Sequence, residues 1–133
     1  MNTRMTKNPA DTPTSSLWER INYSLQTLHS QPGLNARVIA RRLGVSVCAV
    51  RATHRLHQHT SIRSDLARFR VEAAQRVLRE HAATLPSALL MMRAAEIAGF
   101  RSVDEMDRAF LRYRHRSSFD VLLSARMALP RAA

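Results

Sequence analysis

Apolar residues return at helical spacing in successive blocks along the chain, separated by residues that end helices. The first block forms one stripe, made of Leu17, Ile21, Leu25 and Leu28. Ser16, followed three residues later by Glu19, is typical of a capping box at the start of a helix. Pro32 and Gly33 end this predicted helix. We expect it to pack beneath the elements that follow, with Trp18 in the core rather than at a ligand.

Residues 34–55 predict a short helix, a turn and a second helix. Asn35 and Ser46 suit the two N-caps, and Gly44 suits the left-handed residue that ends the first helix. The inward positions are apolar, namely Val38, Ile39, Leu43, Val45 and Val50. The outward positions are cationic or small, namely Arg37, Arg41, Arg42, Cys48, Arg51 and Arg55. This pattern indicates a helix-turn-helix whose second helix fits the DNA major groove, although helix–glycine–helix corners also occur in helical proteins without that role.

A long helix is predicted next, over residues 62–80, with Thr60 or Ser61 as its cap. Its apolar stripe consists of Ile62, Leu66, Phe69, Ala73 and Val77. Arginines occupy the remaining faces. A helix of this length spans roughly 28 Å at 1.5 Å per residue, close to the ~34 Å between successive major grooves.

The pattern around Gly44 then returns around Gly99. Residues 86–98 are apolar and suit a buried helix, and a second amphipathic helix is marked by Met106, Phe110 and Tyr113. A short closing helix is marked by Phe119, Leu122 and Leu123. We therefore predict an all-α fold of about seven helices, in which a linker helix joins two helix-turn-helix units. The predicted parts are a flexible arm (1–15), a first unit (16–61), the linker (62–80), a second unit (81–126) and a tail (127–133).

Composition strengthens the nucleic-acid interpretation. The 133 residues carry a formal net charge of +11, and twenty of the 21 basic residues are arginine, whose planar fork suits phosphates and guanine edges. Such a charge favours a polyanionic partner, either nucleic acid or an anionic membrane. The arginines are spread over several helices, which makes a membrane-surface helix the weaker hypothesis. The lone Cys48, with no transmembrane run and no signal-peptide core, predicts a soluble cytoplasmic protein associated with the nucleoid.

Other chemistries find little support in the sequence. No phosphate loop, nucleophile–base constellation or apolar carboxylate cluster is present, so an enzyme is not predicted. His54, His57 and His59 together with Cys48 match no standard zinc spacing, and His54 occupies an expected core position. We predict no metal, no cofactor and no small-molecule ligand. The thiol of Cys48 is either inert or redox-sensing, since it lies near a helix N-terminus.

Three motifs, in this order, resemble the DNA-binding module of the AraC/XylS family of bacterial transcription regulators. They are residues 39–46 (IARRLGVS), residues 68–78 (RFRVEAAQRVL) and residues 99–110 (GFRSVDEMDRAF). The resemblance implies seven helices and two recognition helices that enter adjacent major grooves. Because the chain has no room for a ligand-sensing domain, it resembles the small stand-alone members that recruit RNA polymerase.

Some positions depart from the family pattern. His59 and His115 stand where the family usually has glycine, after each recognition helix, and Ser118 replaces a customary proline. His54 and Met106 replace apolar aromatic residues. Roughly six extra residues fall within 82–90, which predicts either an early start of the next helix or a longer loop.

The resemblance also implies which residues contact DNA. In the first unit the base-reading positions fall on Cys48, Arg51 and Ala52, and the phosphate contacts on Arg41, Arg42, Ser46 and Arg55, with Val47 at the same helix start. In the second unit the equivalent base positions are Val103, Asp104, Asp107 and Arg108, and the predicted contact set also includes Arg101, Ser102 and Arg112.

Charge divides the two units. Residues 34–79 hold ten arginines and two acids, whereas residues 80–126 hold seven arginines and six acids. Ser102 and Glu105 form a second capping-box pattern, and carboxylates beside phosphates would repel. We therefore expect the first recognition helix to dominate specific binding.

The function predicted from the sequence is a DNA-binding transcription activator without a ligand-sensing domain of its own. Double-stranded DNA is the expected partner, with RNA polymerase or another transcription regulator as a second. The alternative is a protein-interaction module derived from the same fold. It would use the acidic second recognition helix or the apolar stretch 89–92 to bind another regulator or the polymerase.

Overall fold

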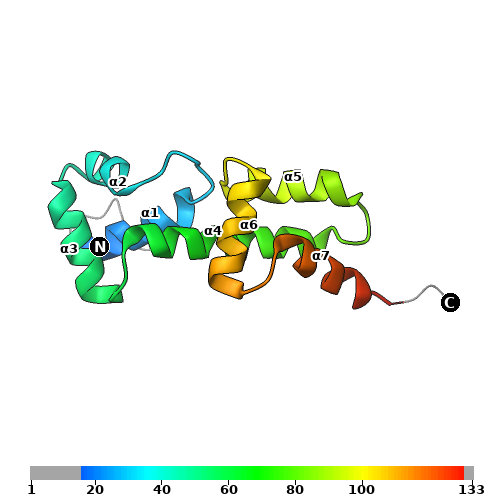
Figure 1. Ribbon diagram of the computed structural model, residues 1–133. Coiled ribbons are helices and arrows are strands. Elements are labelled where there is room, and N and C mark those ends of the chain that lie inside the picture. The colour runs from blue at the N-terminus through cyan, green and yellow to red at the C-terminus, as the bar shows by residue number, and fades with distance from the viewer. Residues whose placement is uncertain (1–15, 131–133) are drawn as a thin grey trace, which may run out of the picture. The chain divides into compact units, whose positions relative to one another are not determined.

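The computed structural model describes residues 16–130, and within them the backbone forms seven α-helices and no strand (Figure 1). The helices are α1 (Leu17–Leu28), α2 (Ala36–Leu43), α3 (Val47–Gln58), α4 (Ile62–Glu80), α5 (Ser87–Ala98), α6 (Val103–Arg114) and α7 (Ser118–Met127). The predicted all-α fold is confirmed. The predicted arm at residues 1–15 and the last three residues of the predicted tail lie outside the described residues.

The chain folds as two compact units that divide within α4, between Leu66 and Ala67. In the first unit, α2 and α3 pack against α1 and against each other. Its core contains the fully buried side chains of Ile21, Leu25, Ile39 and Val50. The first two turns of α4 add Ile62 and Leu66 to the buried apolar residues.

Local capping explains where the helices of the first unit begin and end. Ser16 and Glu19 form the predicted capping box reciprocally, with bonds of 3.1 and 2.8 Å. The side chain of Asn35 accepts the Val38 N–H at 2.9 Å. Gly44 ends α2 with a φ of 69°, a left-handed conformation that costs glycine least. The sequence therefore predicted this corner correctly.

Helix α4 is buried more widely than its predicted stripe. Ser61 is its cap, since its hydroxyl accepts the Ser64 N–H at 3.1 Å. Four of the five predicted stripe residues are buried, while Phe69 is half-buried. The prediction missed three further buried positions, which lie on another side of the helix: Val71, Ala74 and Leu78. The reason is that the C-terminal half of α4 lies within the core of the second unit, so it buries a wide arc rather than one stripe.

In the second unit, α5, α6 and α7 surround a core built on Leu90, Met106, Phe110 and Leu122. α5 has 12 residues where α2 has 8, so the extra residues of this unit include an early helix start. The helix predicted to be buried is buried on one side, at Leu90, Met91, Ala94, Ala95 and Ala98, while Leu89 and Met92 are exposed. These two residues lie on the side of α5 away from its neighbours.

The predicted closing helix is present as α7, and it buries only one of the three apolar residues that marked it. Leu122 is buried, Phe119 and Leu123 are exposed, and Ser118 and Val121 take the other inward positions. Arg126 fixes the other end of α7 by donating to the carbonyls of Ala82 and Leu85 and to the Ser87 hydroxyl, at 3.1, 2.6 and 2.6 Å. These bonds hold α7 against the loop that precedes α5.

Two histidines occupy the left-handed region after the candidate recognition helices. His59 has a φ of 59° and His115 a φ of 57°, and among the described residues these are the positive φ values outside glycine. Each donates its backbone N–H back into its helix, to the carbonyl of Arg55 or of Leu111. The turn therefore keeps the geometry typical of a glycine cap while carrying a β-carbon.

Candidate nucleic-acid interface

The best candidate for a recognition element is α3, which presents two distinct faces. Val50 and His54 point inward and are 0% and 1% exposed. The predicted contact residues at the other positions are exposed, namely Ser46, Cys48, Arg51, Ala52 and Arg55. Val47 is half-buried at the first position of the helix. The helix is thus anchored by one side and leaves its predicted contact residues accessible.

The outer surface of α2 and α3 carries positive charge without compensation. Residues 36–58 include five arginines and no aspartate or glutamate, and all five arginines are exposed: Arg37, Arg41, Arg42, Arg51 and Arg55. Arg41 and Arg42 lie in the last turn of α2, just before the corner that leads to α3. A surface with one sign of charge attracts polyanions over several ångströms.

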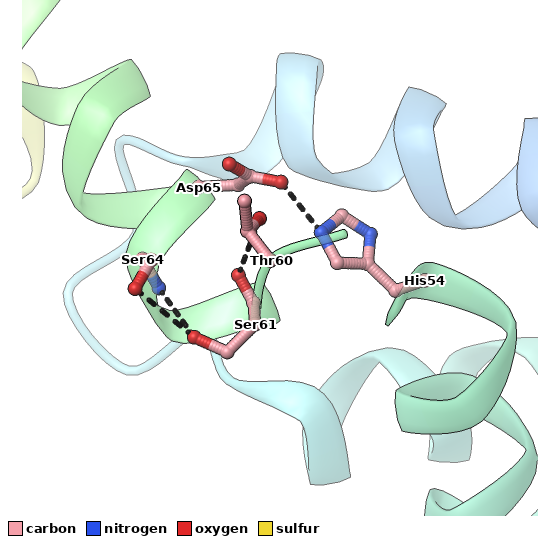
Figure 2. A network of polar contacts seen from close by, with 5 residues as sticks. All are labelled: His54, Thr60, Ser61, Ser64 and Asp65. Atoms are coloured by element: carbon pink, nitrogen blue, oxygen red, sulfur yellow. Dashed lines mark hydrogen bonds and ion pairs between the residues drawn. The ribbon is translucent and has the colours of Figure 1, made fainter. Parts of the chain in front are cut away.

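A buried polar contact positions α3 against the next helix (Figure 2). The Nε2–H of His54 donates to Oδ2 of Asp65 at 2.6 Å, and Asp65 lies in the first turn of α4. Nδ1 of the same ring is buried and has no hydrogen-bond partner among the described residues. His54 occupies the predicted core position, but its partner Asp65 was not foreseen, because the two lie 11 residues apart across a turn.

A stacked pair of rings holds α3 against α1. The rings of Trp18 and His57 have centroids 5.1 Å apart and planes inclined by 24°. Trp18 is half-buried, so the expected core role is correct in part, and its indole ring also supports the C-terminal half of α3. A guanidinium N–H of Arg20 adds a bond of 3.3 Å to the carbonyl of Leu43 at the end of α2. The stacked rings hold the C-terminal end of α3 against α1, and the Arg20 bond holds the end of α2 at the Gly44 corner.

In the second unit, α6 occupies the corresponding position after the Gly99 turn. The predicted contact residues are exposed at five positions, namely Arg101, Ser102, Asp104, Arg108 and Arg112. Val103 is half-buried. Met106 and Phe110 are fully buried on the opposite side. α6 is therefore amphipathic in the same sense as α3.

Two of the three carboxylates on α6 are engaged within the protein. Asp107 Oδ1 accepts the backbone N–H of Ser118 at 2.9 Å and also the Ser118 hydroxyl. Glu105 Oε1 accepts the N–H of Arg101 at 2.8 Å, while the Glu105 N–H donates to the Ser102 hydroxyl at 3.0 Å. The predicted capping box is therefore half right, since the carboxylate reaches the residue before the cap. Asp104 is the exposed member of the three.

Glu105 lies in the field of two cations of its own unit. Burial lowers the pKa of the Arg70 guanidinium below its ordinary value, the Glu105 carboxylate raises it, and the charge of Arg101 lowers it further. Asp104 is the exposed carboxylate of α6 and the one that would repel phosphates most directly.

Within residues 16–130, no group of three or more histidine, cysteine, aspartate or glutamate side chains is arranged to hold a metal ion. Across the same residues, no helix has the length and apolarity needed to cross a membrane.

Comparisons with known proteins identify the fold. The C-terminal domain of AraT, a response regulator from Geobacillus stearothermophilus, superposes with a TM-score of 0.74 at 21% identity, covering 85% of this chain and 88% of that domain. The C-terminal domain of the two-component response regulator YesN from Fusobacterium nucleatum superposes with a TM-score of 0.68 at 17% identity, covering 78% and 95%. The chain has their fold. No family model and no curated protein matches its sequence.

The features that sequence reasoning missed are side-chain contacts between helices. The partner of His54 and the acceptor role of Asp107 both join residues 11 positions apart. One signal was available for the second contact. Ser118 stands where the AraC/XylS family usually has proline, and a serine has the backbone N–H and the hydroxyl that a proline lacks.

Proposed function

We propose that this protein is a sequence-specific DNA-binding transcription regulator of the AraC/XylS type. The observation that carries the proposal is the outer face of α3, where Arg51 and Arg55 are exposed on a helix anchored by Val50 and His54. A helix of this kind, following a tight glycine turn, enters the major groove in helix-turn-helix proteins. The fold shared with two response-regulator domains supports the same conclusion.

Each predicted contact has a role within this proposal. Arg51 reads a base edge, because a guanidinium bonded to guanine O6 and N7 is the commonest specific contact in the major groove. Arg41, Arg42 and Arg55 bind phosphates, which set the position of the protein without selecting sequence. Ser46 caps α3 through the Ala49 N–H, and a contact to phosphate is secondary.

The second unit contributes a weaker contact. Arg108 and Arg112 are the exposed cations on α6, and Arg101 and Ser102 precede it. Asp104 is exposed near the start of the helix and would meet phosphates with repulsion, or accept a bond from cytosine N4. We assign α6 to orientation and to modest discrimination.

The direct test is binding to duplex DNA as a function of salt. A regulator that neutralises phosphates should lose affinity linearly on a logarithmic salt scale, with a slope of about −0.9 per phosphate contacted. Selection of bound fragments from randomised and genomic DNA, followed by sequencing, should yield a defined motif. Weak binding with no motif at any salt concentration would contradict the proposal.

We further propose that the regulator is an activator that recruits RNA polymerase, as the family resemblance implies. A reporter promoter carrying the selected motif should be transcribed more strongly when the protein is supplied. Lowered transcription would identify a repressor instead.

Exposed apolar side chains favour the alternative, a protein-interaction module. Leu89 and Met92 are 40% and 63% exposed on α5, and Phe119, Leu123 and Met127 line one side of α7. Such a module would bind DNA weakly and without sequence preference. It would also form a complex with another regulator or with the polymerase, and Met92→Glu should disrupt that complex.

A further inference from the structure

The accessible side chains in the first half of α3 form a small set on one face. Cys48 and Ala52 are four residues apart and therefore lie one above the other on the helix, with Arg51 beside them. All three are exposed. In helix-turn-helix complexes it is the N-terminal part of the recognition helix that contacts base edges. These three residues are thus the ones placed to read sequence.

The chemistry of this face is restricted. It carries no asparagine or glutamine to bond adenine, because the one glutamine of α3, Gln58, is its last residue. It also carries no carboxylate to accept a hydrogen bond from cytosine N4. The remaining direct contacts are Arg51 to guanine and an apolar contact from Ala52 or Cys48 to a thymine methyl group. Of the four bases, two have a matching side chain here.

We propose that the segment of DNA read by α3 contains a guanine next to a thymine, with Arg51 selecting the guanine and Ala52 and Cys48 selecting the thymine methyl. This inference rests on the proposed function, because it names the sequence that the DNA-binding site would take. It also explains why the exposed face of α3 that carries Arg51 and Arg55 includes the two small side chains of Cys48 and Ala52.

The test uses the full chain and two randomised duplex libraries, one made with thymine and one with deoxyuridine, which lacks the methyl group. In the thymine library, selection should enrich a guanine adjacent to a thymine. In the deoxyuridine library the preference for guanine should remain, and the preference at the adjacent position, where thymine was selected, should disappear. Loss of one buried methyl corresponds to about a fourfold loss of affinity for the selected site.

Two variants assign the bases to residues. Arg51→Ala should remove the guanine preference, with a loss of roughly 5- to 150-fold on the selected site. Ala52→Gly should weaken the thymine preference, since the Cys48 contact remains, and should keep the guanine preference. Ala88→Gly, at an exposed position of α5, is the matched control for the loss of helix propensity and should leave both preferences intact. If a variant does not fold, the two-library comparison with the unmodified protein still decides the thymine contact.

The outcomes separate this inference from the proposed function. A strong motif whose bases are unaffected by Arg51→Ala, or whose thymine preference persists in deoxyuridine DNA, would overturn the base assignment and leave a DNA-binding regulator in place. A library that never departs from random composition would overturn the regulator proposal and this inference together.

Discussion

Nε2 of His54 lies 2.6 Å from Oδ2 of Asp65, a contact that joins the buried side of α3 to the first turn of α4. His54 is 1% exposed, so its polar nitrogens depend on partners inside the protein. A polar contact on the buried face of α3 therefore helps to fix the orientation of the candidate recognition helix. The AraC/XylS family, which the sequence resembles, usually has an apolar aromatic residue at this position.

Replacing Asp65 should destabilise the first unit. Asp65→Ala leaves the buried His54 ring without its hydrogen-bond acceptor, and an orphaned buried donor costs about 1–3 kcal/mol. Urea unfolding followed by the fluorescence of Trp18, the one tryptophan of the chain, would measure the loss. With phenylalanine in place of His54, no buried ring nitrogen needs the Asp65 carboxylate. The double variant His54→Phe with Asp65→Ala should therefore lose less free energy of unfolding than the sum of the losses of the two single variants. Additive losses would show that the contact carries no coupling energy.

The left-handed histidines should be replaceable by glycine with a gain in stability. The left-handed conformation costs a residue with a β-carbon roughly 1–2 kcal/mol. Replacement by glycine removes this cost, but part of the benefit is lost because glycine has more conformational freedom in the unfolded state. We expect His59→Gly and His115→Gly each to raise the free energy of unfolding by about 1 kcal/mol.

A third histidine supplies the control for this prediction. His29 caps α1 with a φ of −61°, an ordinary right-handed conformation. His29→Gly should therefore give no gain in thermal or urea unfolding. A gain there equal to that at His59 and His115 would show that backbone strain is not the cause.

The carboxylates of α6 should behave differently from one another. Asp104→Asn removes an exposed negative charge beside the candidate interface and should strengthen binding to duplex DNA at low salt. Because Asp104 lies in the first turn of α6, the variant should lose only the helix-dipole interaction, about 0.3–1 kcal/mol. Asp107→Ala should instead destabilise the second unit by about 1–3 kcal/mol, because Ser118 loses the acceptor of its N–H and hydroxyl. Thermal unfolding and fluorescence anisotropy on the same samples separate the two effects. Equal behaviour of the two variants would contradict the structural role of Asp107.

Specific binding should depend more on α3 than on α6. We expect Arg51→Ala to abolish specific binding in gel shifts and Arg108→Ala to weaken it less, since α3 lies in a region free of acids and α6 does not. Arg79→Ala, an exposed arginine in the last turn of α4, provides a control for the loss of one positive charge. Equal losses at Arg51 and Arg108, or the reverse order, would show that both units read bases.

Sequence reasoning succeeded where structure is decided by neighbours along the chain. The caps at Ser16, Asn35 and Ser46 and the inward position of Val50 follow from hydrogen bonds and spacings of three or four residues. These interactions form within one or two helical turns, so the pattern of residue types is enough to predict them. The exposed face of α3 was predicted for the same reason.

Sequence reasoning failed where a helix meets a neighbour that its own pattern does not specify. α7 is apolar on more than one side, and its orientation follows from the anchoring of Ser118 by Asp107. The wide buried arc of α4 follows from the second unit packing around its C-terminal half.

The sequence by itself thus determined the helices, their ends, the Gly44 corner and the cationic face of α3, because each depends on local periodicity and charge. The tertiary structure alone decided which polar groups face one another. It paired His54 with Asp65 and Asp107 with Ser118. Such pairings depend on how helices pack in space, and several packings satisfy the same local pattern.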